Sequence, residues 1–194
     1  SMYLARFFAT EFDQHQETVW ATRDALEKPF ARLVEVCVSS LSQGGKILFF
    51  GNGGSAGDAQ HLATELAARY TPNRVAIAAM ALTTDTSLIT AIGNDLGFDR
   101  VFARQIEALG KPGDIAIGVS TSGKNANVTQ GLEQDRAMGL GGAALSGRAG
   151  GDLVGCVLPL LVAPRAPTSP LQKMLTPLAT TLWRAFQIEL ALAA

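Results

Sequence analysis

Short apolar runs alternate along the chain with segments of helical periodicity. Each run is followed by glycine or polar residues, and continuous apolar runs of this length are typical of strands buried on both faces of a parallel sheet. The strand candidates span residues 46–50, 75–80, 114–119, 142–146 and 157–162. The last is expected at an edge of the sheet, because Pro159 cannot donate a ladder hydrogen bond.

Helical periodicity fills the intervening segments. Apolar residues recur at helical spacing from Leu4 to about Leu41, where Pro29 predicts a break between two helices. Further helices are expected at residues 56–70, 86–92, 98–109 and 125–138, with a turn at 93–97 and a closing C-terminal helix. In that last helix Pro177 predicts a kink or a new start. This alternation predicts an α/β fold: a three-layer αβα sandwich with a five-stranded parallel sheet, preceded by N-terminal helices.

Length and composition favour one domain, residues 1–194, with N-terminal helices in 2–43 and the αβα core in 44–194. The 194 residues are 47% hydrophobic, which suffices for a core covered on both sides. A net charge of -1 and a pI near 6.1 give no global positive field for nucleic acid or an anionic membrane.

Targeting signals and cysteine usage favour the cytoplasm. Cys37 and Cys156 are far apart, which predicts neither a disulfide framework nor a thiolate metal site. No signal peptide or membrane span is expected, and Ser1 before Met2 resembles the remnant of a cleaved tag.

Two glycine- and serine-rich loops follow strand candidates: Gly-Asn-Gly-Gly-Ser at 51–55 and Ser-Thr-Ser-Gly at 120–123. Hydroxyl groups, permissive glycine backbone and the free N–H groups of the following helix together suit a phosphate. Ligands of parallel α/β sheets bind beyond the carboxyl ends of the strands, where both loops are expected. The alternative is that such clusters serve only as caps and turns. Neither loop has the spacing of a dinucleotide fingerprint or a P-loop, so no nucleotide cofactor is expected.

Three further motifs accompany these loops: His61-Leu-Ala-Thr-Glu65, Arg69-Tyr70 and Gly93-Asn94-Asp95. Taken in order, the motifs resemble those of the phosphoheptose (sedoheptulose 7-phosphate) isomerases and their close sugar-isomerase (SIS) relatives. The resemblance covers most of the chain and is strongest from residue 46 to 127. It implies the flavodoxin-like SIS fold, a sugar phosphate of the heptose class as ligand, and a homotetramer with active sites at subunit interfaces.

The resemblance also implies which residues contact the sugar phosphate. By position these are Asn52, Gly53, Gly54, Ser55, Asn94, Asp95, Ser120, Thr121, Ser122, Asn125 and Gln172. The position of Asn125 is usually a serine in the isomerases. The larger amide implies an altered phosphate pose.

His61 and Glu65 are candidates for acid–base chemistry. They are four residues apart in the helix expected after the first loop, so both lie on one face. Aldose–ketose isomerisation needs a base that moves a proton between C1 and C2, and Glu65 is the natural choice. An isolated pair with this spacing is also typical of an exposed helical surface.

The C-terminal part of the chain departs from the family. In the isomerases the matching histidine and glutamate bind zinc together with a glutamine and a later histidine, which is also the general acid. Gln172 matches that glutamine. The residues at the expected glutamate and two histidines are Lys173, Leu175 and Thr180. Because His15 and His61 are the only histidines, the usual acid is missing, and the zinc site that the resemblance implies is incomplete, with only His61, Glu65 and Gln172 as ligands.

Two functions therefore remain open. The first is an isomerase of sedoheptulose 7-phosphate or a similar ketose, with Glu65 as base and an altered or solvent-supplied acid. The second is a non-catalytic sugar-phosphate sensor or regulator that resembles the replication-initiator-associating proteins, SIS relatives that also lack the final histidine. A purely structural oligomer is a third possibility, which leaves the polar loops unexplained.

Overall fold

A computed structural model describes residues 2–68, 76–157, 159–164 and 170–193 of the chain. Five parallel strands form one sheet in the order β2-β1-β3-β4-β5. Their bounds are β1 Ile47–Gly51, β2 Ala79–Ala81, β3 Ile115–Ser120, β4 Gly141–Ser146 and β5 Leu160–Val162. This strand order is the flavodoxin-like one, and the predicted fold class is confirmed.

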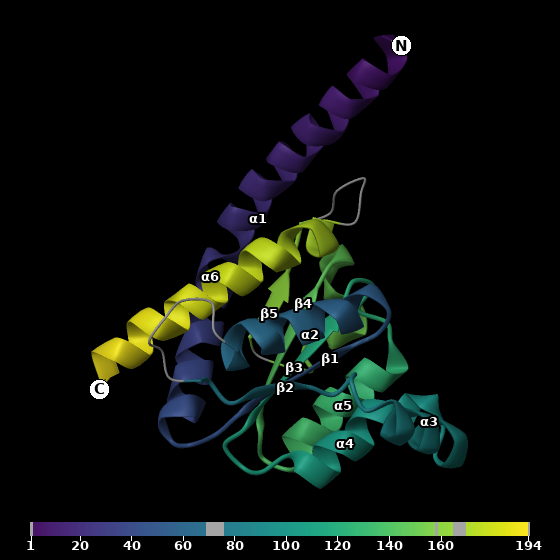
Figure 1. The fold of residues 1–194 in the computed structure, drawn as a ribbon, viewed down its shortest axis with the longest axis vertical. Coiled ribbons are helices and arrows are strands. Elements are labelled where there is room, and N and C mark those ends of the chain that lie inside the picture. Colours follow the sequence, from purple (N-terminus) through teal and green to yellow (C-terminus); the bar gives the residue numbers. More distant parts are fainter. Residues whose placement is uncertain (1, 69–75, 158, 165–169, 194) are drawn as a thin grey trace.

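Helices cover both faces of the sheet (Figure 1). One face is covered by α1 (Met2–Ser42), α2 (Gly54–Ala67) and α6 (Pro170–Ala193). The other is covered by α4 (Val101–Leu109) and α5 (Ala126–Ala137), with α3 (Thr86–Asp95) and the short η1 (Phe98–Arg100) beside them. The 3-10 segment η2 (Arg148–Leu153) follows β4. The N-terminal half of α1 extends beyond the body of the molecule. Within the described ranges, no helix combines the length and the apolar character needed to cross a membrane.

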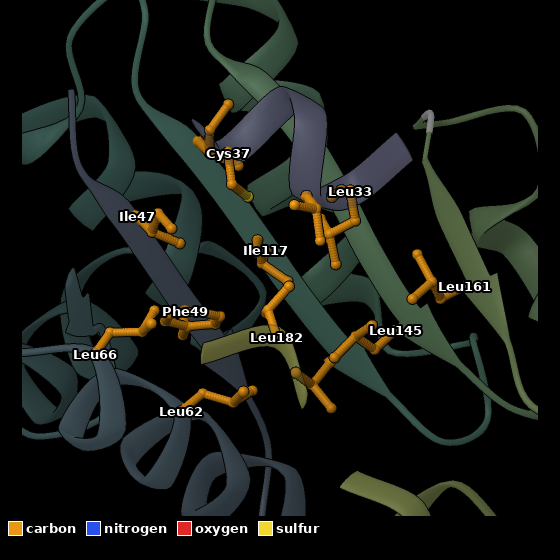
Figure 2. Close-up of a cluster of buried hydrophobic side chains, with 14 of the residues drawn as sticks. Leu33, Cys37, Ile47, Phe49, Leu62, Leu66, Ile117, Leu145, Leu161 and Leu182 are labelled. Atoms are coloured by element: carbon orange, nitrogen blue, oxygen red, sulfur yellow. The ribbon is translucent and has the colours of Figure 1, made fainter. Parts of the chain in front are cut away.

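The sheet separates two hydrophobic clusters. Along β1, Ile47 and Phe49 face the cluster under α1, α2 and α6, whereas Leu48 and Phe50 face the cluster under α4 and α5. Figure 2 shows the first cluster, in which helix and strand side chains interdigitate. Burial raises the pKa of the Cys37 thiol in this cluster to about 12, so it stays a protonated, unreactive thiol. Burial on both faces explains why the strands are continuous apolar runs.

Two prolines lie inside helices. The predicted break at Pro29 is wrong, because α1 continues through it. Proline removes one helical hydrogen bond, but Leu26 and Leu33, buried on either side of Pro29, hold one continuous helix against the core. Likewise no new helix begins at Pro177, since α6 runs through it, and the Thr181 hydroxyl donates to the Pro177 carbonyl oxygen (2.7 Å).

Element boundaries differ from the sequence prediction at the margins of the sheet. The predicted turn at 93–97 is wrong in its first half, because α3 continues to Asp95. The strand predicted at 75–80 is displaced to β2, and Val75 lies outside the described residues. The strand predicted at 157–162 is reduced to β5, whose expected edge position is confirmed. Both short strands have a neighbour on one side only, so fewer backbone groups can pair.

Asp135 is an isolated carboxylate in the second cluster. It is 1% exposed, and neither side-chain oxygen makes a well-formed hydrogen bond among the described residues. Burial raises its pKa from about 3.8 to about 7, and the backbone N–H of Ala116 opposes only part of this shift. Gly142 provides the space, since a Cβ there would lie 2.5 Å from Asp135 Oδ2.

We expect the stability of the protein to fall as pH rises from about 4 to about 7. In this range the unfolded chain releases the Asp135 proton while the folded chain retains it, which disfavours folding by up to about 4 kcal/mol at pH 7 and above. Asp135→Asn should remove this slope and be more stable than the parent at pH 8, as measured by urea unfolding at pH 5 and pH 8. The exposed Asp13→Asn is the matched control. Equal slopes in the parent and Asp135→Asn would contradict this account.

Candidate functional site

The two glycine- and serine-rich loops leave the sheet side by side. Strands β1 and β3 are neighbours, and Gly51 pairs in register with Val119. A Cβ on Gly51 would lie 2.6 Å from the Val119 carbonyl oxygen, so only glycine fits where the strands approach. The parallel topology thus brings both loops to the same carboxyl edge, as the sequence predicts.

An amide pair ties the first loop to the helix after the second. Asn52 Nδ2 donates to Asn127 Oδ1 (2.8 Å), and Asn127 Nδ2 donates to Asn52 Oδ1 (2.9 Å). Asn127 is 3% exposed and lies in the first turn of α5. The sequence analysis did not identify Asn127 as a site residue. The pattern that could have identified it is a polar residue at the start of a helix expected at the edge of the sheet.

A third loop, residues 147–153 after β4, packs against the loop at residues 120–123. Gly123 has a left-handed φ of 68°, and its carbonyl oxygen accepts from the Asp152 N–H (2.8 Å). A Cβ on Gly123 would lie 2.2 Å from the Gly150 carbonyl oxygen. The Ser146 hydroxyl adds a buried bond to the Ser120 carbonyl oxygen (2.9 Å). The sequence analysis did not predict this contact, although the glycines at 147, 150 and 151 indicate a tight loop.

The second loop is closed by the residue that precedes α5. Asn125 is the N-cap of α5, but its side chain makes no capping hydrogen bond. Its Oδ1 instead accepts from the hydroxyls of Ser120 (2.5 Å) and Ser122 (3.3 Å). Thr121 is half-buried beside them. Three hydroxyls and a helix N-terminus therefore meet within one short segment, as an anion site requires.

The candidate acid–base residues lie on α2, which starts in the first loop. Ser55 is buried beneath that start, Glu65 is half-buried, and His61 is exposed one turn before Glu65. Asp58, which sequence reasoning also missed, is half-buried, and its Oδ2 has no hydrogen-bond partner among the described residues. Burial raises the pKa of Asp58, while the nearby charge of His61 lowers it less.

The remaining predicted residues lie on α3 and α6 or outside the described part of the chain. Asn94 and Asp95 are exposed at the end of α3, where Asn94 Nδ2 donates to Asp95 Oδ1 (2.7 Å). Gln172 lies in α6, and its side chain is outside the described part, as are Arg69 and Tyr70. Within the described ranges, no three histidine, cysteine or acidic side chains are grouped so that they could hold a metal ion.

Comparison with known proteins identifies relatives of this chain. Residues 12–147 match the family model of the SIS domain. A phosphoheptose isomerase from Paramagnetospirillum magneticum is 54% identical over 173 residues, which are 89% of this chain and 90% of that protein. The structure of a phosphoheptose isomerase from Neisseria gonorrhoeae superposes with a TM-score of 0.88 and 37% identity, covering 95% of this chain and 99% of that one. A phosphoheptose isomerase structure from Francisella tularensis gives a TM-score of 0.89 with 30% identity over 94% of this chain and 97% of that one.

Proposed function

The chain belongs to the SIS-domain family, among relatives of the phosphoheptose isomerases, and we propose that it interconverts sedoheptulose 7-phosphate, or a similar ketose phosphate, with the aldose. One observation carries the proposal: a half-buried carboxylate, Glu65, lies on the helix that begins in one of two joined polar loops. The loops suit a sugar phosphate, and the carboxylate suits proton transfer beside it.

Each part of the site then has a role. The phosphate binds at Ser120, Thr121 and Ser122 against the N-terminus of α5, where N–H groups and the helix dipole favour an anion. The sugar hydroxyls contact the first loop, residues 52–55. Glu65 removes a proton from C1 of the ketose and returns it to C2, through an enediolate intermediate. Because the chain has no histidine after His61, we assign the compensating proton on the oxygen atoms to water.

The donor atoms present do not suit a tight zinc site. His61 and Glu65 supply two ligands, and Gln172 would supply a neutral amide as the third, a poor partner for Zn²⁺. Neither the base nor the phosphate loop as proposed requires a metal. We expect zinc to be lost on dialysis, as measured by mass spectrometry of metals. One tightly held zinc per chain after dialysis would overturn this part of the proposal.

We further propose that the protein is a homotetramer in which Asn94 and Asp95 complete the site of a neighbouring subunit. Exposed aromatic residues on the projecting part of α1 support the assembly into an oligomer, since Phe8 and Phe12 are 63% and 61% exposed with ring centroids 4.6 Å apart. Sedimentation should give the mass of four chains, and Phe8→Glu with Phe12→Glu should give smaller species. A monomeric parent protein would contradict the assignment. A cytoplasmic location also remains a prediction.

Isotope exchange tests the function directly. Sedoheptulose 7-phosphate incubated with the protein in D₂O, with and without zinc, should exchange its C1 proton, which can be followed by NMR. The missing histidine favours the second function, a sugar-phosphate sensor without turnover. That alternative predicts calorimetric binding of the sugar phosphate with no exchange under either condition. If neither exchange nor binding is found, both functions are excluded.

A further inference from the structure

The serine hydroxyls of the phosphate loop already donate their only protons within the loop. Ser120 Oγ accepts from the Gly123 N–H (3.0 Å), and Ser122 Oγ accepts from the Lys124 N–H (3.2 Å). Each hydroxyl has a single proton, and both protons are donated to Asn125 Oδ1. Neither serine can donate to a phosphate oxygen while Asn125 holds this position.

Asn125 Oδ1 therefore occupies the place that an oxygen of a bound anion would take. It lies between two hydroxyl donors at the start of α5. The 2.5 Å contact with Ser120 Oγ has the length of an O–H···O bond and is too short for a typical N–H···O bond, so the amide oxygen faces the serine. An N-cap asparagine ordinarily accepts from an N–H group of the first helical turn. Here the side chain makes no such bond.

We propose that Asn125 limits the affinity of this site for anions, because its amide oxygen competes with the phosphate for Ser120 and Ser122. The inference rests on the sugar-phosphate site proposed above. The anion binds only after the Asn125 side chain has rotated away from Ser120 and Ser122. Binding therefore breaks the two hydrogen bonds that Asn125 Oδ1 accepts. The competition therefore weakens the binding of inorganic phosphate and of sugar phosphates by the same factor.

The direction in which Asn125→Ala changes the affinity for phosphate tests this competition. Asn125→Ala frees both hydroxyls, so we expect the affinity for inorganic phosphate and for sedoheptulose 7-phosphate to rise about tenfold, measured by calorimetry. Asn125→Asp keeps the size and the acceptor but adds a negative charge, and should weaken both affinities about tenfold or more. If Asn125 instead donated to the phosphate, Asn125→Ala would bind more weakly, and that result, or an unchanged affinity, overturns the inference.

Two controls show whether a change in affinity comes from the freed hydroxyls or from a change in the fold. Because the Asn125 side chain makes no capping bond, Asn125→Ala should fold normally, which its melting temperature checks. Thr129→Ala, one turn further along α5, removes a hydroxyl that donates to the Asn125 carbonyl oxygen (3.3 Å), and should leave the affinities unchanged. If the parent binds sugar phosphate and Asn125→Ala is no tighter, the inference alone fails. If no variant binds sugar phosphate, the proposed function fails with it.

Discussion

Glu65→Gln should lower the rate of C1 proton exchange in sedoheptulose 7-phosphate about 10³-fold, within the range that a positioned general base contributes. Glutamine keeps the size of the side chain and can still accept hydrogen bonds, but it cannot take up the proton. Glu65 is half-buried, whereas Leu62 and Leu66 supply the buried contacts of this part of α2. The substitution should therefore leave the fold intact.

Binding must be measured beside exchange for this result to be informative. The dissociation constant of Glu65→Gln for the sugar phosphate should stay within about threefold of the parent value, because the phosphate is held by the second loop. Glu133→Gln, an exposed glutamate on α5, is the matched control and should exchange at the parent rate. If Glu65→Gln exchanges within about threefold of the parent, another group is the base.

The sequence was sufficient for the layers of the fold and for the position of the loops. Runs such as residues 46–50 and 114–119 are apolar at every core position because both faces of the sheet are covered, and this signal is local. The prediction at Pro29 was wrong because the contacts that decide it are not local. Whether a helix survives Pro29 depends on buried contacts such as Leu33, which only the tertiary structure provides.

The parts of the site that were missed depend on contacts between distant residues. The Asn52–Asn127 pair joins positions 75 apart in the chain, and it exists because β1 and β3 are neighbours in the sheet. The resemblance marks Asn125 as a departure from the family, but whether its side chain caps α5 or bonds the serines depends on its rotamer and its contacts, which only the tertiary structure provides.

Gly123→Ala should destabilise the protein by about 3 kcal/mol and weaken sugar-phosphate binding at least tenfold. A left-handed φ of 68° penalises any Cβ by about 1–2 kcal/mol. The added carbon would also lie 2.2 Å from the Gly150 carbonyl oxygen, a backbone atom that cannot rotate away. The second loop and the loop after β4 must then separate, which displaces Ser120 and Ser122 from the start of α5.

Gly139→Ala isolates the effect of the overlap from that of backbone strain. Gly139 has a similar φ of 75°, but a Cβ there would meet no atom within 4 Å, and the residue lies beyond the other end of α5. We expect it to lose about 1–2 kcal/mol of stability and no affinity for the sugar phosphate. Urea unfolding and calorimetry on both variants give the comparison. Equal losses of stability with unchanged binding would show that the two loops do not depend on each other, and the phosphate site would then need no support from the loop after β4.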